Sequence, residues 1–224
     1  MCERPASLAN AMATLSEFDS KRLLVDHGLP VLPERSVATA VEAVAAADEL
    51  GYPCVMKLSG DQIAHKTERN LVRLSIGGRD QALDAATELL AAATPDDGAV
   101  TLLVAPMVSS SREFIVGAQR SAEFGAVVMV GIGGIFAEAL EDVSFRMLPA
   151  STADIEAMLD DLRTGALLEP FRGEPAVDRA GLVRVIESVA QAMLDRDDIV
   201  AIDVNPVLIN NGQPVAVDAL VEVA

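Results

Sequence analysis

The sequence predicts an α+β protein whose sheets are mostly antiparallel. Segments typical of strands and helices follow one another without the strict alternation that a doubly wound parallel sheet requires. The chain also ends in two apolar runs joined by Asn211-Gly212, a residue pair that favours a tight hairpin turn. With 224 residues, of which 51% are hydrophobic, the chain can bury a substantial core in one or two compact units.

Charge and cysteine content argue against several classes of protein. The net charge of −17 repels phosphate backbones and anionic membranes, so we expect neither a nucleic acid nor a membrane as partner. Cys2 and Cys54 fit no metal-binding spacing and suit a reducing compartment. The N-terminal residues form no signal-peptide pattern, and no uncharged apolar run reaches about 18 residues. The expected location is the cytoplasm.

The first half of the chain carries clear start and stop signals for helices. Ser16 is expected to cap a helix that ends at Gly28, and Thr39 a second helix that Gly51 closes. Apolar patterning then predicts strands over 52–59, 71–76 and 99–108, with a helix over 81–93.

The second half reads as further strands, two helices and the hairpin. Strands are expected over 112–120, 126–132 and 135–149, helices over 151–162 and 178–194, and the hairpin over 199–223. Pro106 interrupts a strand pattern beside Ala105, which suggests a boundary between two lobes. We therefore expect a flexible N-terminus over 1–14, a first lobe over 15–105 and a second lobe over 106–224.

The hairpin register brings three oxygen-bearing side chains together. With Asn211 and Gly212 at the turn, Asn205 falls opposite Asp218, and Asp203 lies two residues earlier on the same face. Carboxylate and amide oxygens suit Mg²⁺, which completes its shell with water and phosphate. Alternatively, Asn205 marks a bend and Asp218 faces solvent, since a slip of one residue in the register would separate the three.

Two further stretches are ambiguous when each is taken alone. GIGGIF (131–136), which contains Gly133 and Gly134, is similar to a phosphate cradle, but the dinucleotide fingerprint requires a helix after the glycines and a strand-like segment follows here. KLSGDQIAHKTE (57–68) holds Lys57 and His65 and is either a phosphate-binding loop or an exposed charged loop.

Glu113 and Arg146 are similarly ambiguous, because both fall in strand-like segments and could lie on exposed strand faces.

Taken together, the motifs resemble a known family over nearly the whole chain, from about residue 15 to the C-terminus. Their order and spacing are similar to those of the nucleotide-binding beta subunit of ADP-forming acyl-CoA synthetases, an ATP-grasp protein related to the beta subunit of succinyl-CoA synthetase. The motifs are HGLPV (27–31), LGYPCVMK (50–57), HKTE (65–68), EFIVGAQR (113–120), FGAVVMVGIGGIFAEALEDVSFRMLP (124–149), FRGEP (171–175), IDVNPVLI (202–209) and VDA (217–219).

This resemblance implies an ATP-grasp fold, in which two lobes clasp ATP or ADP between them. Lys57 matches a lysine that contacts the nucleotide phosphates, and His65 matches a loop histidine that takes up phosphate. The remaining matches concern the hinge and nucleotide (Pro106, Met107, Val108, Glu113, Gly133 and Gly134), the reacting phosphates (Glu138 and Arg146) and the magnesium ion (Asp203, Asn205 and Asp218).

The implied chemistry is a relay that interconverts acyl-CoA, ADP and phosphate with acid, CoA and ATP. A neutral imidazole such as that of His65 is a competent nucleophile near neutral pH. The family places CoA binding on an alpha subunit, so the expected partners are this subunit in an α2β2 assembly and an acyl phosphate or phosphohistidine as phosphoryl donor. This chain alone is then expected to bind Mg-ATP without making acyl-CoA.

Two departures from the family pattern keep other functions open. Asn70 and Leu71 stand where the family usually has a glycine pair, and Ala105-Pro106 stands where the hinge often carries Gln-Glu. A carboxylate–amine ligase of the same fold is one alternative, although direct ligation needs no histidine such as His65. A nucleotide-binding regulatory subunit without catalysis is another.

Overall fold

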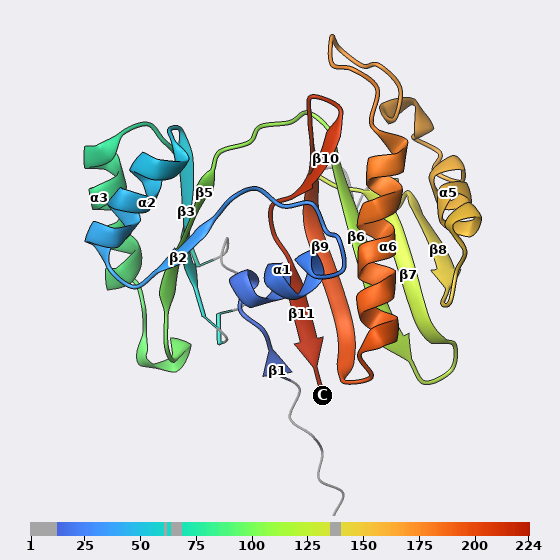
Figure 1. The fold of residues 1–224 in the computed structure, drawn as a ribbon, viewed down its shortest axis with the longest axis horizontal. Helices are drawn as coiled ribbons and strands as arrows, with labels where there is room; N and C mark the ends of the chain where they lie inside the picture. The colour runs from blue at the N-terminus through green and yellow to red at the C-terminus, as the bar shows by residue number, and fades with distance from the viewer. Residues whose placement is uncertain (1–12, 61, 64–68, 135–139) are drawn as a thin grey trace, which may run out of the picture.

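The computed structural model describes residues 13–60, 62–63, 69–134 and 140–224, and its architecture is two sheets, each with helices on one face (Figure 1). Every strand pairing recorded between the described strands is antiparallel. The predicted α+β class with antiparallel sheets is therefore confirmed.

The smaller unit is a four-stranded sheet in the order β2-β5-β3-β4. Its helices are rich in alanine, and fully buried alanines such as Ala47 and Ala86 allow α2 and α3 to pack closely on the sheet. Its elements are β2 (Arg35–Val37), α2 (Ala40–Leu50), β3 (Cys54–Ser59), β4 (Val72–Ile76), α3 (Arg79–Ala91), a 3₁₀ turn (Pro95–Asp97) and β5 (Thr101–Pro106).

The larger unit is a seven-stranded sheet in the order β1-β11-β9-β6-β7-β8, with β10 also paired to β9. Helix α6 lies along one face of this sheet and α5 lies near β8 (Figure 1). Its elements are β1 (Ala13–Thr14), α1 (Glu17–Val25), β6 (Glu113–Ser121), β7 (Gly125–Ile132), β8 (Val143–Met147), α5 (Thr152–Asp160), a 3₁₀ turn (Gly165–Leu167), α6 (Arg179–Asp195), β9 (Ile199–Asn210), β10 (Gln213–Ala216) and β11 (Leu220–Val223).

The helix starts read from the sequence are confirmed by their caps. The Ser16 side chain accepts a hydrogen bond from the Asp19 amide, and Thr39 forms a reciprocal capping box with Glu42. Gly51, with φ of 93°, closes α2 as expected. The first helix is shorter than predicted, because α1 ends at Val25 and the chain then turns through residues 26–28.

At the N-terminal end of the chain, the residues of the two hydrophobic cores are divided differently from the predicted lobes. The core of the small sheet draws on residues between Ala43 and Val104. Leu24 and Leu29, however, belong to the core of the large sheet, because α1 packs against β11 and α6. The segment from Ala13 to Leu29 thus lies with the second lobe, although it precedes the first in the sequence.

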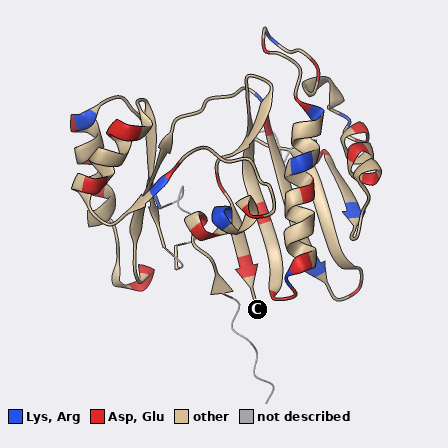
Figure 2. Cartoon of the chain, viewed as in Figure 1, with Lys and Arg blue, Asp and Glu red and all other residues tan. Residues whose placement is uncertain are grey.

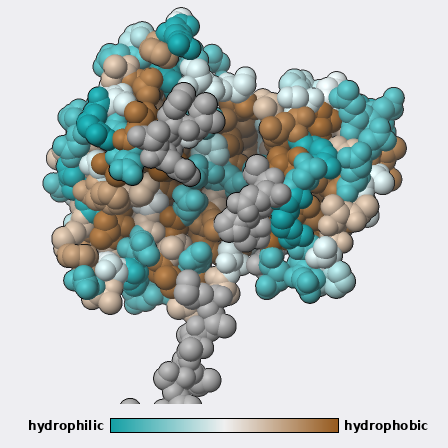
Figure 3. Space-filling model, turned by 180° about the vertical axis from the view of Figure 1, so that it is seen from behind, coloured by the Kyte–Doolittle hydropathy of each residue, from teal (hydrophilic) through white to brown (hydrophobic). Residues whose placement is uncertain are grey.

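Charged residues are concentrated on the helices and connecting loops, whereas most strands carry few of them (Figure 2). The face of the large sheet opposite its helices, seen from behind in Figure 3, shows apolar surface, to which Val143, Phe145 and Met147 of β8 contribute exposed side chains. None of the helices in the described part of the chain has the length and apolarity needed to cross a membrane.

Arg120 on β6 holds the C-terminal end of α6. Its guanidinium donates to the carbonyl oxygens of Met193 at 2.7 Å, Arg196 at 3.2 Å and Ile199 at 3.2 Å. The last carbonyls of a helix have no partner within the helix, so this side chain both satisfies them and offsets the negative end of the helix dipole.

We predict that Arg120→Met lowers the free energy of unfolding by about 1–3 kcal/mol, because several carbonyls lose a charged donor. Urea denaturation followed by circular dichroism measures the change. The control is Arg179→Met, which removes only an exposed pair with Asp160 and is expected to cost at most about 1 kcal/mol. Equal losses in the two variants would contradict the capping role of Arg120.

Candidate functional site: a cleft between the two sheets

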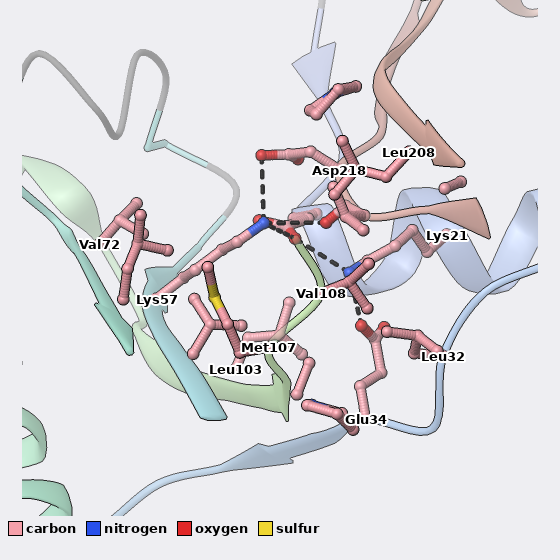
Figure 4. A pocket seen from close by; sticks show the side chains of 18 of the residues that line it. Lys21, Leu32, Glu34, Lys57, Val72, Leu103, Met107, Val108, Leu208 and Asp218 are labelled. Atoms are coloured by element: carbon pink, nitrogen blue, oxygen red, sulfur yellow. Dashed lines mark hydrogen bonds and ion pairs between the residues drawn. The ribbon is translucent and has the colours of Figure 1, made fainter. Parts of the chain in front are cut away.

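The candidate site is a cleft of about 390 Å³ that lies between the two sheets. This volume is in the range of sites for small molecules and cofactors. Both units and the segment that joins them contribute to its walls (Figure 4). The lining residues are Glu17, Lys21, Leu32, Glu34, Val55, Lys57, Asn70, Val72, Leu74, Leu103, Ala105, Pro106, Met107, Val108, Glu113, Pro206, Leu208, Ala216, Val217 and Asp218.

One part of the cleft is apolar and adjoins the connection between the sheets. Val72 and Leu103 of the small sheet contribute to it, as does Leu208 of the large sheet (Figure 4). Met107 and Val108, just after β5, also line it. The Met107 amide donates to the Pro53 carbonyl at 3.0 Å and is therefore occupied. The next residue along this segment, Val108, also lines the cleft.

The polar part of the cleft is organised around the ammonium group of Lys57. This group donates to Glu17 Oε1 at 2.7 Å, to the Val217 carbonyl at 2.9 Å and to Asp218 Oδ2 at 3.3 Å. An ammonium has three N–H donors, so these three contacts account for all of them. Lys57 stands on β3, whereas all three acceptors belong to the large-sheet unit, and the contacts therefore join the two sheets.

Glu17 also connects Lys57 to a second lysine. Its Oε1 accepts from Lys21 at 2.9 Å, and Lys21 in turn donates to Glu34 at 2.5 Å (Figure 4). The Glu17 side chain is fully buried and that of Lys21 is 3% exposed. The cluster thus contains two ammonium groups and the three carboxylates of Glu17, Glu34 and Asp218 within contact distance.

These contacts determine the charge state of the cluster. Burial lowers the pKa of Lys57, but the Glu17 and Asp218 carboxylates outweigh it and raise the pKa above its usual value. Lys57 is therefore a cation at neutral pH. Burial raises the pKa of Glu34, although Lys21 opposes the shift.

The hairpin register predicted from the sequence is confirmed. Val207 pairs with Ala216 on one side of the region and Asp203 pairs with Leu220 on the other. The amide of Asn205 donates to the carbonyl of Asp218 at 3.3 Å, so these two residues lie opposite each other as expected. The second arm is nevertheless interrupted, because β10 ends at Ala216 and β11 begins only at Leu220.

The side chains of Asp203, Asn205 and Asp218 form a set that fits a magnesium ion. Partial desolvation and, next, the Asp218 carboxylate raise the pKa of Asp203, while a hydrogen bond with Asn205 lowers it. A divalent cation would offset the repulsion between the Asp203 and Asp218 carboxylates, which lie near the Asn205 side chain. No group of three or more His, Cys, Asp or Glu side chains in the described ranges is arranged for a metal. An ion held here would therefore need water or phosphate oxygens as well.

Gly133 and Gly134 stand at the end of β7 beside Glu113. The Gly133 amide donates to the Glu113 carbonyl at 2.8 Å, and a side chain at position 133 would meet Glu113 backbone atoms at 3.2 Å. Gly134 has φ of 76°, in the left-handed region. The glycines thus permit a close approach of the backbone to Glu113, which lines the cleft.

The structure explains one departure from the family pattern. Asn70 lines the cleft with φ of 57°, a left-handed conformation that asparagine tolerates better than other non-glycine residues. Leu71 is 1% exposed and fills the core of the small sheet, and its carbonyl accepts from the Leu58 amide at 3.0 Å. Position 70 therefore adopts a left-handed conformation without glycine.

Of the predicted site residues that the structure describes, five are not among the residues that line the cleft, namely Gly133, Gly134, Arg146, Asp203 and Asn205. His65 and Glu138 lie outside the described residues. Arg146 is on β8, where its guanidinium donates to Asp161 at 2.7 Å on the side of the sheet that α5 covers. The roles assigned to these residues stay predictions.

Sequence reasoning missed three charged residues that line the cleft, namely Glu17, Lys21 and Glu34. Glu17 and Lys21 are four residues apart in α1, a spacing typical of an exposed ion pair on a helix surface. The motif order gave no reason to connect them with Lys57. The burial of Glu17 and Lys21 depends on the packing of α1 against β11 and α6, which the sequence does not reveal.

Comparison with known proteins agrees with this architecture. An ATP-grasp domain model matches residues 6–223. The beta subunit of ADP-forming acetate–CoA ligase II of Pyrococcus furiosus is 34% identical over 206 residues, which covers 90% of this chain and 87% of that protein. The beta subunit of ligase I of the same organism is 36% identical over 209 residues, which covers 92% and 90%.

Solved structures are similar as well. Two structures of acetyl-coenzyme A synthetase 1 of Candidatus Korarchaeum cryptofilum match with TM-scores of 0.87 and 0.79 at 28% and 30% identity, covering 95% and 93% of this chain and 94% and 92% of those chains. The second contains coenzyme A and Mg-AMPPCP, with a phosphohistidine segment that points towards the nucleotide binding site.

The chain belongs to the ATP-grasp family. Within this family it stands among the nucleotide-binding beta subunits of ADP-forming acyl-CoA synthetases, which are acid–thiol ligases.

We predict that Asn70→Val lowers the free energy of unfolding by about 1–2 kcal/mol, because a β-branched side chain is strained in the left-handed region. Asn70→Gly is the matched control and is expected to change stability by less than about 0.5 kcal/mol, because glycine adopts this conformation without steric cost. Thermal unfolding of both variants measures the difference, and equal stabilities would contradict it.

Proposed function

We propose that this chain is the nucleotide-binding subunit of an acyl-CoA synthetase that interconverts acyl-CoA, ADP and phosphate with acid, CoA and ATP. The observation that carries the proposal is the buried Lys57 ammonium, held in the cleft beside Asp218. A fixed cation next to candidate magnesium ligands suits the phosphate groups of a nucleotide. The apolar part of the cleft then suits the base.

The base would lie against the segment that joins the sheets. The Pro106 carbonyl is suited to accept from the adenine amino group, and the Val108 amide is suited to donate. The apolar side chains of Val72, Leu103 and Leu208 would enclose the ring. In this arrangement the phosphates extend towards Lys57.

Asp203, Asn205 and Asp218 would hold Mg²⁺, which when bound offsets the negative charge of the phosphates. Lys57 adds a second, fixed positive charge from the opposite sheet. Glu138 and Arg146 are proposed, from the motif they occupy, to act beside the reacting phosphates.

The reaction is proposed to pass through His65. The CoA-binding partner would convert acyl-CoA and phosphate to acyl phosphate and CoA. The His65 imidazole would then attack phosphorus, releasing the carboxylate and giving phosphohistidine, and an ADP oxygen would take the phosphoryl group to give ATP and regenerate the imidazole. The first step forms a carbon–oxygen bond and breaks the thioester carbon–sulfur bond, and each of the two later steps forms one bond to phosphorus and breaks another.

A separate alpha subunit is proposed as partner because the Pyrococcus relatives are named as beta subunits. We propose an α2β2 assembly in which CoA and the acyl group bind the alpha subunit. Magnesium, ATP and ADP would bind this chain.

Calorimetric titration of ATP into the purified chain, with Mg²⁺ and then with EDTA, tests the nucleotide site. We predict Mg²⁺-dependent binding that Asp218→Asn weakens by about tenfold or more, because a carboxylate ligand is lost. Glu222→Gln removes a carboxylate on the adjoining strand, away from the cleft-lining residues, and is expected to leave the affinity unchanged. No binding by the wild-type chain, or equal binding with EDTA, would contradict the proposal.

Incubation of the chain and its alpha partner with γ-³²P-ATP tests the relay. We predict an acid-labile, base-stable phosphoryl group on the wild-type chain and none on His65→Ala, while the variant still binds ATP. Turnover by His65→Ala with an amine acceptor would instead favour direct carboxylate–amine ligation. Nucleotide binding without phosphorylation would favour a regulatory subunit.

A further inference from the structure

Resting on the proposed function, we infer that Glu17 is a positioning residue for Lys57 and keeps its ammonium from pairing fully with Asp218. The inference starts from the contact distances. Lys57 Nζ is 2.7 Å from Glu17 and 3.3 Å from Asp218, so Glu17 is the closer carboxylate. Glu17 is also the more buried, since its side chain is 0% exposed and that of Asp218 is 34% exposed.

Glu17 is held in place by the large-sheet unit. It is the first residue of α1, and the Ser20 hydroxyl of the same helix accepts from the Val221 amide at 3.1 Å. The Leu15 amide also donates to the Val221 carbonyl, at 2.9 Å. Two contacts therefore fix the start of α1 to β11, next to the 217–218 segment that provides the other acceptors of Lys57.

The second lysine of the cluster also contacts Glu17, at 2.9 Å, but Lys57 is the closer of the two, at 2.7 Å. Lys21 is closer to Glu34, at 2.5 Å, than to Glu17, and the Lys57–Asp218 contact is the longer of the two that Lys57 makes to carboxylates, at 3.3 Å. Glu17 thus contacts both ammonium groups, and burying a carboxylate is costly unless it is well bonded. The contact between Glu17 and Lys57 therefore gives the buried carboxylate of Glu17 a role in the proposed nucleotide site.

The consequence concerns competition for Asp218. Without the Glu17 carboxylate, the charge of Lys57 would be balanced mainly by Asp218, and the ammonium would move towards it. A cation at Asp218 would then have to displace a closer ion pair than the present contact of 3.3 Å, and the phosphates would face an ammonium group that has moved from its present position. Glu17 therefore acts on the triphosphate end of the site and has no role at the apolar end that receives the base.

The test measures dissociation constants for Mg-ATP and for AMP with Glu17→Gln, alone and in a Lys57→Met background. We expect Glu17→Gln to weaken Mg-ATP binding by about tenfold and to change AMP binding by less than about twofold. If Glu17 acts through Lys57, the substitution has no further effect once Lys57 is methionine. Asp19→Asn removes a carboxylate from the same helix turn and is expected to leave Mg-ATP binding unchanged.

A purely structural role for Glu17 would give other results. Unchanged Mg-ATP affinity in Glu17→Gln, an equal loss for AMP, or a full loss that persists in the Lys57→Met background would each overturn the inference. If Glu17→Gln does not fold, Glu17→Asp is measured in the same way, and a selective loss of Mg-ATP affinity is expected because the shorter side chain cannot reach Lys57. Failure of the wild-type chain to bind Mg-ATP would overturn the proposed function itself.

Discussion

The rest of the structure depends on one buried cation that crosses from one sheet to the other. Lys57 extends from β3, and every acceptor of its ammonium belongs to the large-sheet unit. A buried ammonium with unmatched donors would be strongly unfavourable, so the arrangement of the two sheets that places Glu17, Val217 and Asp218 around it is favoured. The same requirement shapes the cleft, because the group that joins the sheets also provides its positive charge.

Two elements of the large-sheet unit, helix α1 and the C-terminal hairpin, provide the acceptors around Lys57. Helix α1 is fixed to β11 through Ser20 and brings Glu17 into place, while the hairpin brings Asp218 opposite Asn205. The second arm of the hairpin is interrupted at 217–219. The pairing on both sides of this interruption nevertheless keeps the register that the turn at residues 211–212 sets. The interruption lets the Val217 carbonyl turn to Lys57 and away from the sheet.

Residues that depart from the family pattern, namely Asn70, Ala105 and Pro106, line the cleft. Asn70 adopts the left-handed backbone conformation that a glycine would adopt, and Leu71 is used as a core residue. In the segment that joins the sheets, Pro106 has no N–H group and the Met107 amide donates to the Pro53 carbonyl, so we propose the Val108 amide as the donor to the nucleotide. The cleft also contains Glu34 and Glu113, so acidic groups are present although the hinge itself lacks one.

The sequence by itself determined the features that depend on neighbours along the chain. The caps at Ser16 and Thr39, the closing glycine at position 51 and the hairpin register were all predicted, because each rests on hydrogen bonds between residues close in sequence or on the strict alternation of a strand. The order of motifs was sufficient for the family. Only the tertiary structure decided that α1 belongs with the large sheet, that Arg146 pairs with Asp161 and that Glu17 contacts Lys57, 40 residues away. Such contacts depend on which charged side chains are buried next to each other in the folded chain, and local sequence patterns do not determine this.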